Sequence, residues 1–239
     1  MADFNTMRAT SAAGRATYID EGLRAHMNKV YGLMSIAMLI TGAVAFGVGM
    51  NDQLVAAIFG TPIKWVVMFA PLAVVFAFSA MLHKMSTSTA QMVFLGYSAL
   101  MGLSLSFIFK AYTGISIAQT FLVTAIAFAS LSLYGYTTKR NLTAMGSFLM
   151  MGVVGLIIAS IVNIFVASSA LQFAISVLGV LIFAGLTAYD TQNIKNTYLQ
   201  LASSDSDFLG KAAILGALQL YMDFLNLFMF LLQFLGNRE

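Results

Sequence analysis

Seven long apolar stretches take up most of this sequence, and they limit its fold more than any other feature. About 20 mostly apolar residues in a helix span the hydrocarbon layer of a bilayer, and a helix satisfies its backbone hydrogen bonds internally. The sequence therefore predicts an all-α integral membrane protein with seven transmembrane helices. The predicted spans are Val30–Met50, Trp65–Leu82, Met92–Phe109, Ile115–Tyr134, Met145–Val166, Phe173–Asp190 and Ala212–Leu235.

The composition leaves little material for a soluble domain. Hydrophobic residues make up 60% of the chain and charged residues 9%, whereas soluble proteins carry roughly a quarter charged residues. We therefore divide the chain into a polar cytoplasmic N-terminal tail, residues 1–29, and a seven-helix transmembrane domain, residues 30–239. The chain contains no cysteine, which excludes disulfides, thiol catalysis and cysteine-bound metals.

The basic residues predict the orientation, because lysine and arginine accumulate on the cytoplasmic side of a membrane. With seven spans, nine basic residues fall on one side and three on the other. We therefore expect a cytoplasmic N-terminus and a C-terminus outside. The first group is Arg8, Arg15, Arg24, Lys29, Lys84, Lys139, Arg140, Lys195 and Lys211, and the second is Lys64, Lys110 and Arg238. Because these residues are scattered over separate loops, we expect no nucleic-acid partner.

One polar face runs along the last predicted span. Gln219, Asp223 and Asn226 follow steps of three and four residues, so they share one side of a helix. A polar group inside a membrane requires a partner, a cavity or a function. An interhelical hydrogen-bond seam would explain Gln219 and Asn226 alone. A carboxylate roughly 16 Å inside the span, eleven residues after Ala212, instead favours a face that lines a crevice or pore.

A second carboxyl group, Asp190, ends the preceding span and shares a helical face with Thr187. Because consecutive spans run antiparallel, Asp190 and Asp223 can meet in the cytoplasmic half of the bundle, where they would share a proton. The alternative for Asp190 is a solvated residue that ends its helix. His83 and Lys84, at the cytoplasmic end of the second span, could pair with Asp190 or extend to the membrane interface.

Enzymatic readings fit this sequence poorly. Intramembrane aspartyl proteases carry Tyr-Asp and Gly-x-Gly-Asp motifs, and Tyr189-Asp190 matches the first of these. The residues before Asp223 are Leu-Tyr-Met, so the glycines of the second motif are missing. The chain also has no Gly-x-Ser-x-Gly elbow, no phosphate-binding loop and no metal-ligand spacing around its two histidines. We therefore predict a protein that is not an enzyme, with no catalytic residues, no cofactor and no metal site.

The acidic segment before the last span does not form a complete calcium-binding loop. Asp205-Ser206-Asp207 is followed by Gly216 where an EF-hand requires a bidentate glutamate. We predict a turn in which Ser206 or Asp207 caps the last helix.

Three segments carry the most distinctive motifs of the chain. They are SLYGYTTK at 132–139, LGVLIFAGLTAYDTQ at 178–192 and ALQLYMDFLNLF at 217–228. Together they resemble the Bax inhibitor-1 family, particularly its bacterial branch, and the resemblance runs from about Tyr31 to the C-terminus. It implies seven helices with the last one central and surrounded by the other six. It also implies a multi-pass protein of the bacterial inner membrane.

The resemblance further implies a pH-sensitive calcium leak. A pair of aspartates on helices six and seven acts as the proton sensor in that family, and these match Asp190 and Asp223 here. Calcium would be the transported ion. The family is expected to carry an arginine on the second helix that latches the closed pore, but this span has none, so Lys84 or His83 is the nearest cation. An alternative implied role is regulation without flux, through binding to a membrane-bound protease or a stress-response partner.

Overall fold

The computed structural model describes residues 2–202 and 205–237, with side chains from Ile19 onward. Within these residues, seven helices are long and apolar enough to cross a membrane, and they correspond to the seven predicted spans. The helices are α1 (Ala2–Gly49), α2 (Asp52–Phe59), α3 (Ile63–Met81) with the short 3-10 turn η1 (Leu82–Lys84), α4 (Thr87–Leu105), α5 (Ile108–Ala111), α6 (Gly114–Thr137), α7 (Thr143–Val166), α8 (Ser169–Leu201) and α9 (Ser206–Leu235). Arg238, one of the three basic residues that we predicted on the outer side of the membrane, lies outside the described residues.

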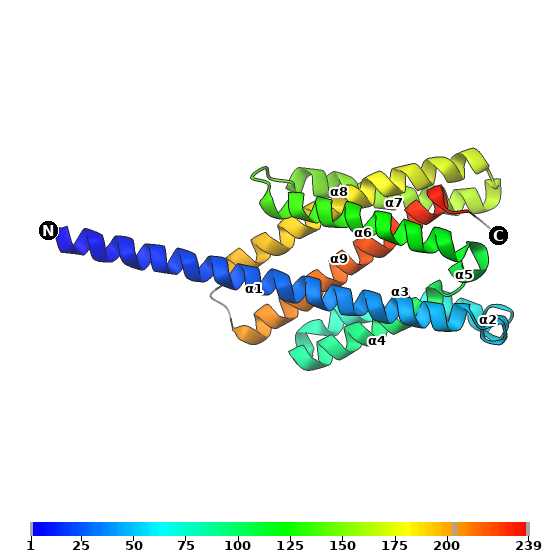
Figure 1. Cartoon of the computed structure of the whole chain (residues 1–239), viewed down its shortest axis with the longest axis horizontal. Helices are drawn as coiled ribbons and strands as arrows, with labels where there is room; N and C mark the ends of the chain where they lie inside the picture. The colour runs from blue at the N-terminus through cyan, green and yellow to red at the C-terminus, as the bar shows by residue number, and fades with distance from the viewer. Residues whose placement is uncertain (1, 203–204, 238–239) are drawn as a thin grey trace.

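The last helix lies deepest in the bundle. In its most apolar stretch 67% of the residues are buried, against 33% or less in each of the other six spans. α9 packs against α8, α1, α6 and α4, while α3 packs on α4 and α7 packs on α8. In Figure 1, α9 crosses diagonally between the α6–α8 group and the α1–α4 group. A carboxylate in this helix is therefore kept away from lipid by its neighbours.

The first helix does not begin at Val30. α1 is continuous through the segment that we predicted as a polar tail, and its membrane-spanning part is Ile19–Gly49. Leu23, Met27 and Val30 are buried, at the spacing of one helix face. The polar residues between them lowered the apparent hydrophobicity of this segment, although its inward face is apolar.

The sixth span is also longer than predicted. α8 continues to Leu201, eleven residues beyond Asp190, so Asp190 lies inside a helix rather than at its end. Ile194 and Tyr198 in this extension are buried. The interpretation of Asp190 as a solvated helix terminus is therefore wrong.

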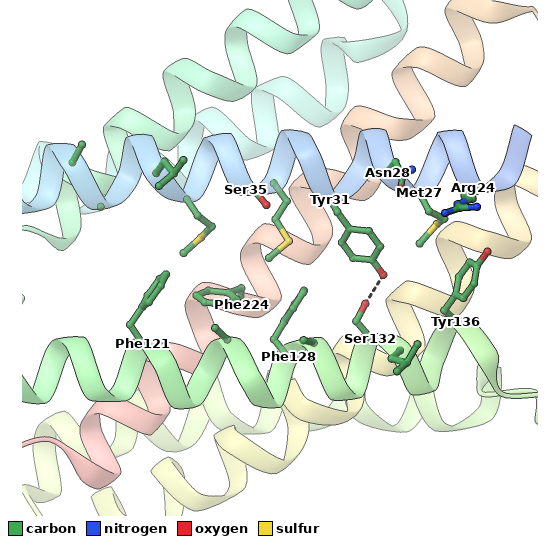
Figure 2. A pocket seen from close by; sticks show the side chains of 18 of the residues that line it. Arg24, Met27, Asn28, Tyr31, Ser35, Phe121, Phe128, Ser132, Tyr136 and Phe224 are labelled. Atoms are coloured by element: carbon green, nitrogen blue, oxygen red, sulfur yellow. Dashed lines mark hydrogen bonds between the residues drawn. The ribbon is translucent and has the colours of Figure 1, made fainter. Parts of the chain in front are cut away.

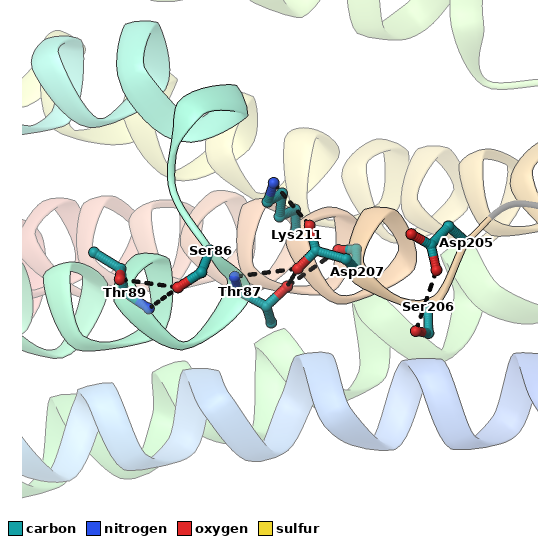
Figure 3. A network of polar contacts seen from close by, with 7 residues as sticks. All are labelled: Ser86, Thr87, Thr89, Asp205, Ser206, Asp207 and Lys211. Carbon is teal, nitrogen blue, oxygen red and sulfur yellow. Dashed lines mark hydrogen bonds and ion pairs between the residues drawn. The ribbon is translucent and has the colours of Figure 1, made fainter.

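The start of α9 is fixed by contacts that differ from the predicted cap. Asp205 occupies the N-cap position and makes no side-chain capping bond, and neither Ser206 nor Asp207 caps α9. The Asp207 carboxylate instead accepts hydrogen bonds from the backbone N–H and hydroxyl of Thr87, the latter at 2.6 Å, and pairs with Lys211 at 2.9 Å (Figure 3). The Asp207 side chain therefore bonds to the first residue of α4 and links the start of α9 to that helix.

The opposite end of the bundle has its own ties. Asp52 of α2 forms an ion pair with Lys110 of α5, and the hydrogen bond from Lys110 holds the pKa of the Asp52 carboxyl below its usual value. The backbone of Asn237 accepts from the N–H of Thr113 at 3.1 Å, and its own N–H donates to Ser116 at 3.0 Å. The end of α9 is therefore bonded to the start of α6.

Candidate functional site: a buried pair of carboxyl groups

The close approach of α8 to α9 determines the geometry of the site. At Gly179 of α8, a β-carbon would lie 2.5 Å from the ring of Phe230, and that ring stacks on Phe183 with 5.7 Å between centroids. At Gly216 of α9, a β-carbon would lie 3.1 Å from the side chain of Ile194. Because a glycine on each helix makes room for a side chain of the other, the two helices stay in register on both sides of the aspartates.

Asp190 and Asp223 meet at this interface. Their carboxyl groups lie within hydrogen-bonding reach of each other. Two carboxylates have no proton to donate, so a direct contact of this kind is stable only when one carboxyl carries a proton or when a cation lies between them. The structure thus brings together the two residues that the sequence singled out.

The burial of Asp223 strengthens the requirement for a proton or a cation at this contact. Asp223 is 5% exposed, and its Oδ2 atom is buried without a hydrogen-bond partner among the described residues. An unpartnered buried oxygen costs about 1–3 kcal/mol, and more when it is charged. A proton shared between Asp223 and the half-buried Asp190 would remove one of the two charges at this contact.

A cavity of about 730 Å³ opens between α3, α8 and α9 and runs toward the pair. Its walls include Asn193 and Thr197, three and seven residues after Asp190, and Gly216 and Gln219, seven and four residues before Asp223. Residues at these spacings share a helix face. The cavity therefore follows the faces that carry both carboxyl groups and comes within one helical turn of each.

The predicted supporting residues occupy different surroundings. Gln219 is exposed and lines the cavity. Asn226 is half-buried and its amide donates to the carbonyl of Met222 at 2.9 Å. The hydroxyl of Thr187 is buried and donates to the carbonyl of Phe183 at 2.8 Å.

The two candidate latch cations lie near the cavity mouth. His83 and Lys84 are exposed, and His83 lines the cavity. Within the described part of the chain neither forms a salt bridge with Asp190, and the ion pair at this end joins Lys211 to Asp207. The described residues also contain no group of three or more acidic or histidine side chains that could hold a metal ion.

Sequence reasoning missed a polar chain that ends beside the pair. The hydroxyl of Tyr31 on α1 bonds to Ser132 on α6, and Ser132 lies 2.9 Å from the hydroxyl of Thr191 on α8. Thr191 follows Asp190 directly and donates to the carbonyl of Thr187 at 2.8 Å. Tyr31 and Ser132 each lie within mainly apolar helices, so only the tertiary structure reveals that they bond to each other.

Seven apolar spans, with two neighbouring carboxyl groups on the last two of them, define a class of multi-pass α-helical membrane protein. The sequence pattern of the family described as "Inhibitor of apoptosis-promoting Bax1" matches residues 23–239. The chain belongs to this family, the Bax inhibitor-1 family, as its motifs predicted.

Bacterial relatives match almost the whole chain. The Rickettsia prowazekii protein RP147 is 44% identical over 239 residues, which is 100% of both chains. The inner membrane protein YbhL of Escherichia coli K12 is 46% identical over 219 residues, covering 91% of this chain and 94% of its own. A Caulobacter vibrioides protein is 47% identical over 251 aligned positions, 100% of both chains. YbhL is named as an inner membrane protein, and the seven apolar helices of this chain agree with a membrane protein.

Proposed function

We propose that this protein is a pH-responsive, calcium-permeable leak or exchanger in which Asp190 and Asp223 form the proton sensor. The observation that carries the proposal is the contact between their carboxyl groups inside the bundle. Two bare carboxylates about 4 Å apart repel by on the order of 4 kcal/mol at the effective dielectric constant of protein sites. One shared proton removes that repulsion and holds α8 against α9.

Loss of the shared proton would favour separation of α8 from α9. As pH rises, the pair becomes fully ionised, and the two helices separate or a cation enters between the carboxylates. Calcium suits this position because carboxylate oxygens are its preferred ligands. The protonated, closed form therefore dominates at low pH, and flux increases as pH rises.

The cavity between α3, α8 and α9 supplies a route to the pair. Its walls carry Gln219 and Asn193, which can replace part of the hydration shell of a passing ion. A conducting state requires that this route continue past Asp223 toward Asn226. Separation of α8 from α9 would open that continuation, since Phe183 and Phe230 stack between the two helices beyond the pair.

Calcium flux into liposomes that contain only the purified protein, measured with a trapped indicator from pH 5 to 8, tests the proposal. Wild-type flux should increase with pH, and Asp223→Asn or Asp190→Asn should each remove most of that pH response. The double variant should be little worse than either single one, because a coupled pair fails as a unit. Asp205→Asn, an exposed carboxylate at the start of α9, is the matched control and should keep the wild-type profile.

Two outcomes would reject the proposal. Absence of flux at every pH would leave a regulatory role through a protein partner as the better account. A wild-type pH profile in both single variants would make the aspartate contact a structural one.

A further inference from the structure

A second, larger cavity lies between α1 and α6. Its volume is about 1110 Å³, slightly above the usual size range of small-molecule sites. Leu39, Phe46 and Leu133 line it and are 73%, 56% and 63% exposed, so it opens onto the outer surface of the bundle. In a seven-span protein that surface faces the acyl chains of lipids.

The lining changes character along the cavity. Arg24, Asn28 and Tyr136 lie at one end, whereas Phe121 lies toward the other end (Figure 2). Phe46 of α1 also lines the cavity. From Arg24 to Phe46 is 22 residues of one helix, or about 33 Å, which is close to the thickness of the hydrocarbon layer. The cavity is thus about as long as the hydrocarbon layer is thick, and it is polar at one end.

The polar end is also basic. Arg24 is exposed and forms no ion pair with a described acidic side chain, although Asp20 and Glu21 precede it on α1. Lys195 lies beside the same end, with its ammonium group 5.3 Å from the ring centre of Tyr136 and donating to the Tyr136 carbonyl at 2.7 Å. A guanidinium with no acidic partner among the described side chains, and with a second cation nearby, is complementary to a phosphate.

Small residues create the space for an elongated ligand. Ala125 and Ala129 of α6 line the cavity together with Gly42 and Ala43 of α1, and a β-carbon at Gly42 would meet nothing within 4 Å. About 10 Å deeper than Arg24, the hydroxyls of Tyr31 and Ser132 bond across the cavity. They lie where the glycerol and ester oxygens of a phospholipid would follow its phosphate.

From this gradient we infer that the α1–α6 cavity binds one anionic phospholipid. Its phosphate contacts Arg24 and Asn28, and one acyl chain lies along the apolar wall toward Phe46. The lining of this cavity shares no residue with that of the cavity near the aspartate pair, and the inference does not rest on the proposed calcium flux.

Native mass spectrometry of the full chain in detergent, with equal added phosphatidylglycerol and phosphatidylcholine, tests this inference. The wild-type protein should retain about fivefold more phosphatidylglycerol, the order of preference that one basic residue gives at an anionic membrane surface. Arg24→Gln should bring the two lipids to equal retention. Lys29→Gln is the matched control, since Lys29 is an exposed cation on the same helix end that does not line the cavity.

Filling the cavity provides an independent test. Ala129→Trp from the α6 wall and Gly42→Leu from the α1 wall should each abolish retention of both lipids. Ala77→Trp, on an exposed part of α3 outside both cavities, should not. Unchanged lipid retention in both filled variants would overturn the inference, as would equal effects of Arg24→Gln and Lys29→Gln. Conversion of a dimer to a monomer by the filled variants, without loss of lipid, would assign the cavity to a contact between two copies.

Discussion

At Gly135, the backbone of α6 approaches α8 so closely that no side chain fits between them. A β-carbon there would lie 2.2 Å from the carbonyl oxygen of Ala188, two residues before Asp190. At the next residue of α8, the ring of Tyr189 would lie 2.4 Å from a β-carbon at Gly146 of α7. Single glycines therefore decide where the segment that carries Asp190 can sit.

Gly135→Ala should destabilise the protein by about 1–3 kcal/mol, because the added methyl group must push α6 away from the backbone of α8. Gly155→Ala is the control, since a β-carbon at that position would meet nothing within 4 Å and alanine favours helix. Thermal unfolding in detergent should show a lower midpoint for the first variant and an equal or higher one for the second. Equal midpoints for both variants would mean that the α6–α8 contact adapts to a methyl group.

The aspartates could be predicted from the sequence because their chemistry is rare in an apolar helix. Asp223 and Asp190 stood out without any knowledge of their neighbours, and the structure places them in contact. The partners of the other polar groups could not be predicted in this way. The hydroxyls of Thr41 and Tyr221 lie 2.6 Å apart on α1 and α9, and serine, threonine and tyrosine are too common in membrane helices for one sequence to indicate which of them meet.

At the scale of the elements, the existence of each helix was predictable and its ends were not. Hydrophobicity averaged over a window gives the seven spans. The same average ends α1 and α8 too early, where their outward faces become polar. Met27 and Tyr198 lie in these polar segments, but they are buried and extend the apolar inward faces of the two helices. Whether a polar segment stays helical depends on the helices that it packs against, which a window average does not contain.

Along α9, the periodicity of the polar face predicts which positions water reaches. Because the chain has no native cysteine, single cysteines can be introduced without background labelling. Gln219→Cys lies on the wall of the cavity and should react quickly with a small charged thiol reagent. Leu225→Cys replaces a residue that is 4% exposed and should be protected.

Asn226→Cys extends the same measurement past the aspartate pair. Its reaction should be slow at low pH, where the shared proton holds α8 against α9, and should accelerate as pH rises. Protection of all three cysteines at every pH would show that the polar face of α9 is a dry packing seam.

For the whole molecule, an odd number of spans predicts that the two ends of the domain lie on opposite sides of the membrane. The start of α9 is bonded to the start of α4 through Asp207, and its end is bonded to the start of α6 through Asn237, so this helix crosses the full bundle. The distribution of nine basic residues against three then predicts that the Asn141 connection is cytoplasmic and that the C-terminus is outside.

Reporter fusions test this orientation. Alkaline phosphatase, which is active outside, should be active when fused at Gly236 and inactive when fused at Asn141. A cytoplasmic fluorescent reporter should give the reverse. Both fusions reporting the cytoplasm would mean that α9 enters and leaves on one side, and exchanged signals would mean that the positive charges do not orient this protein.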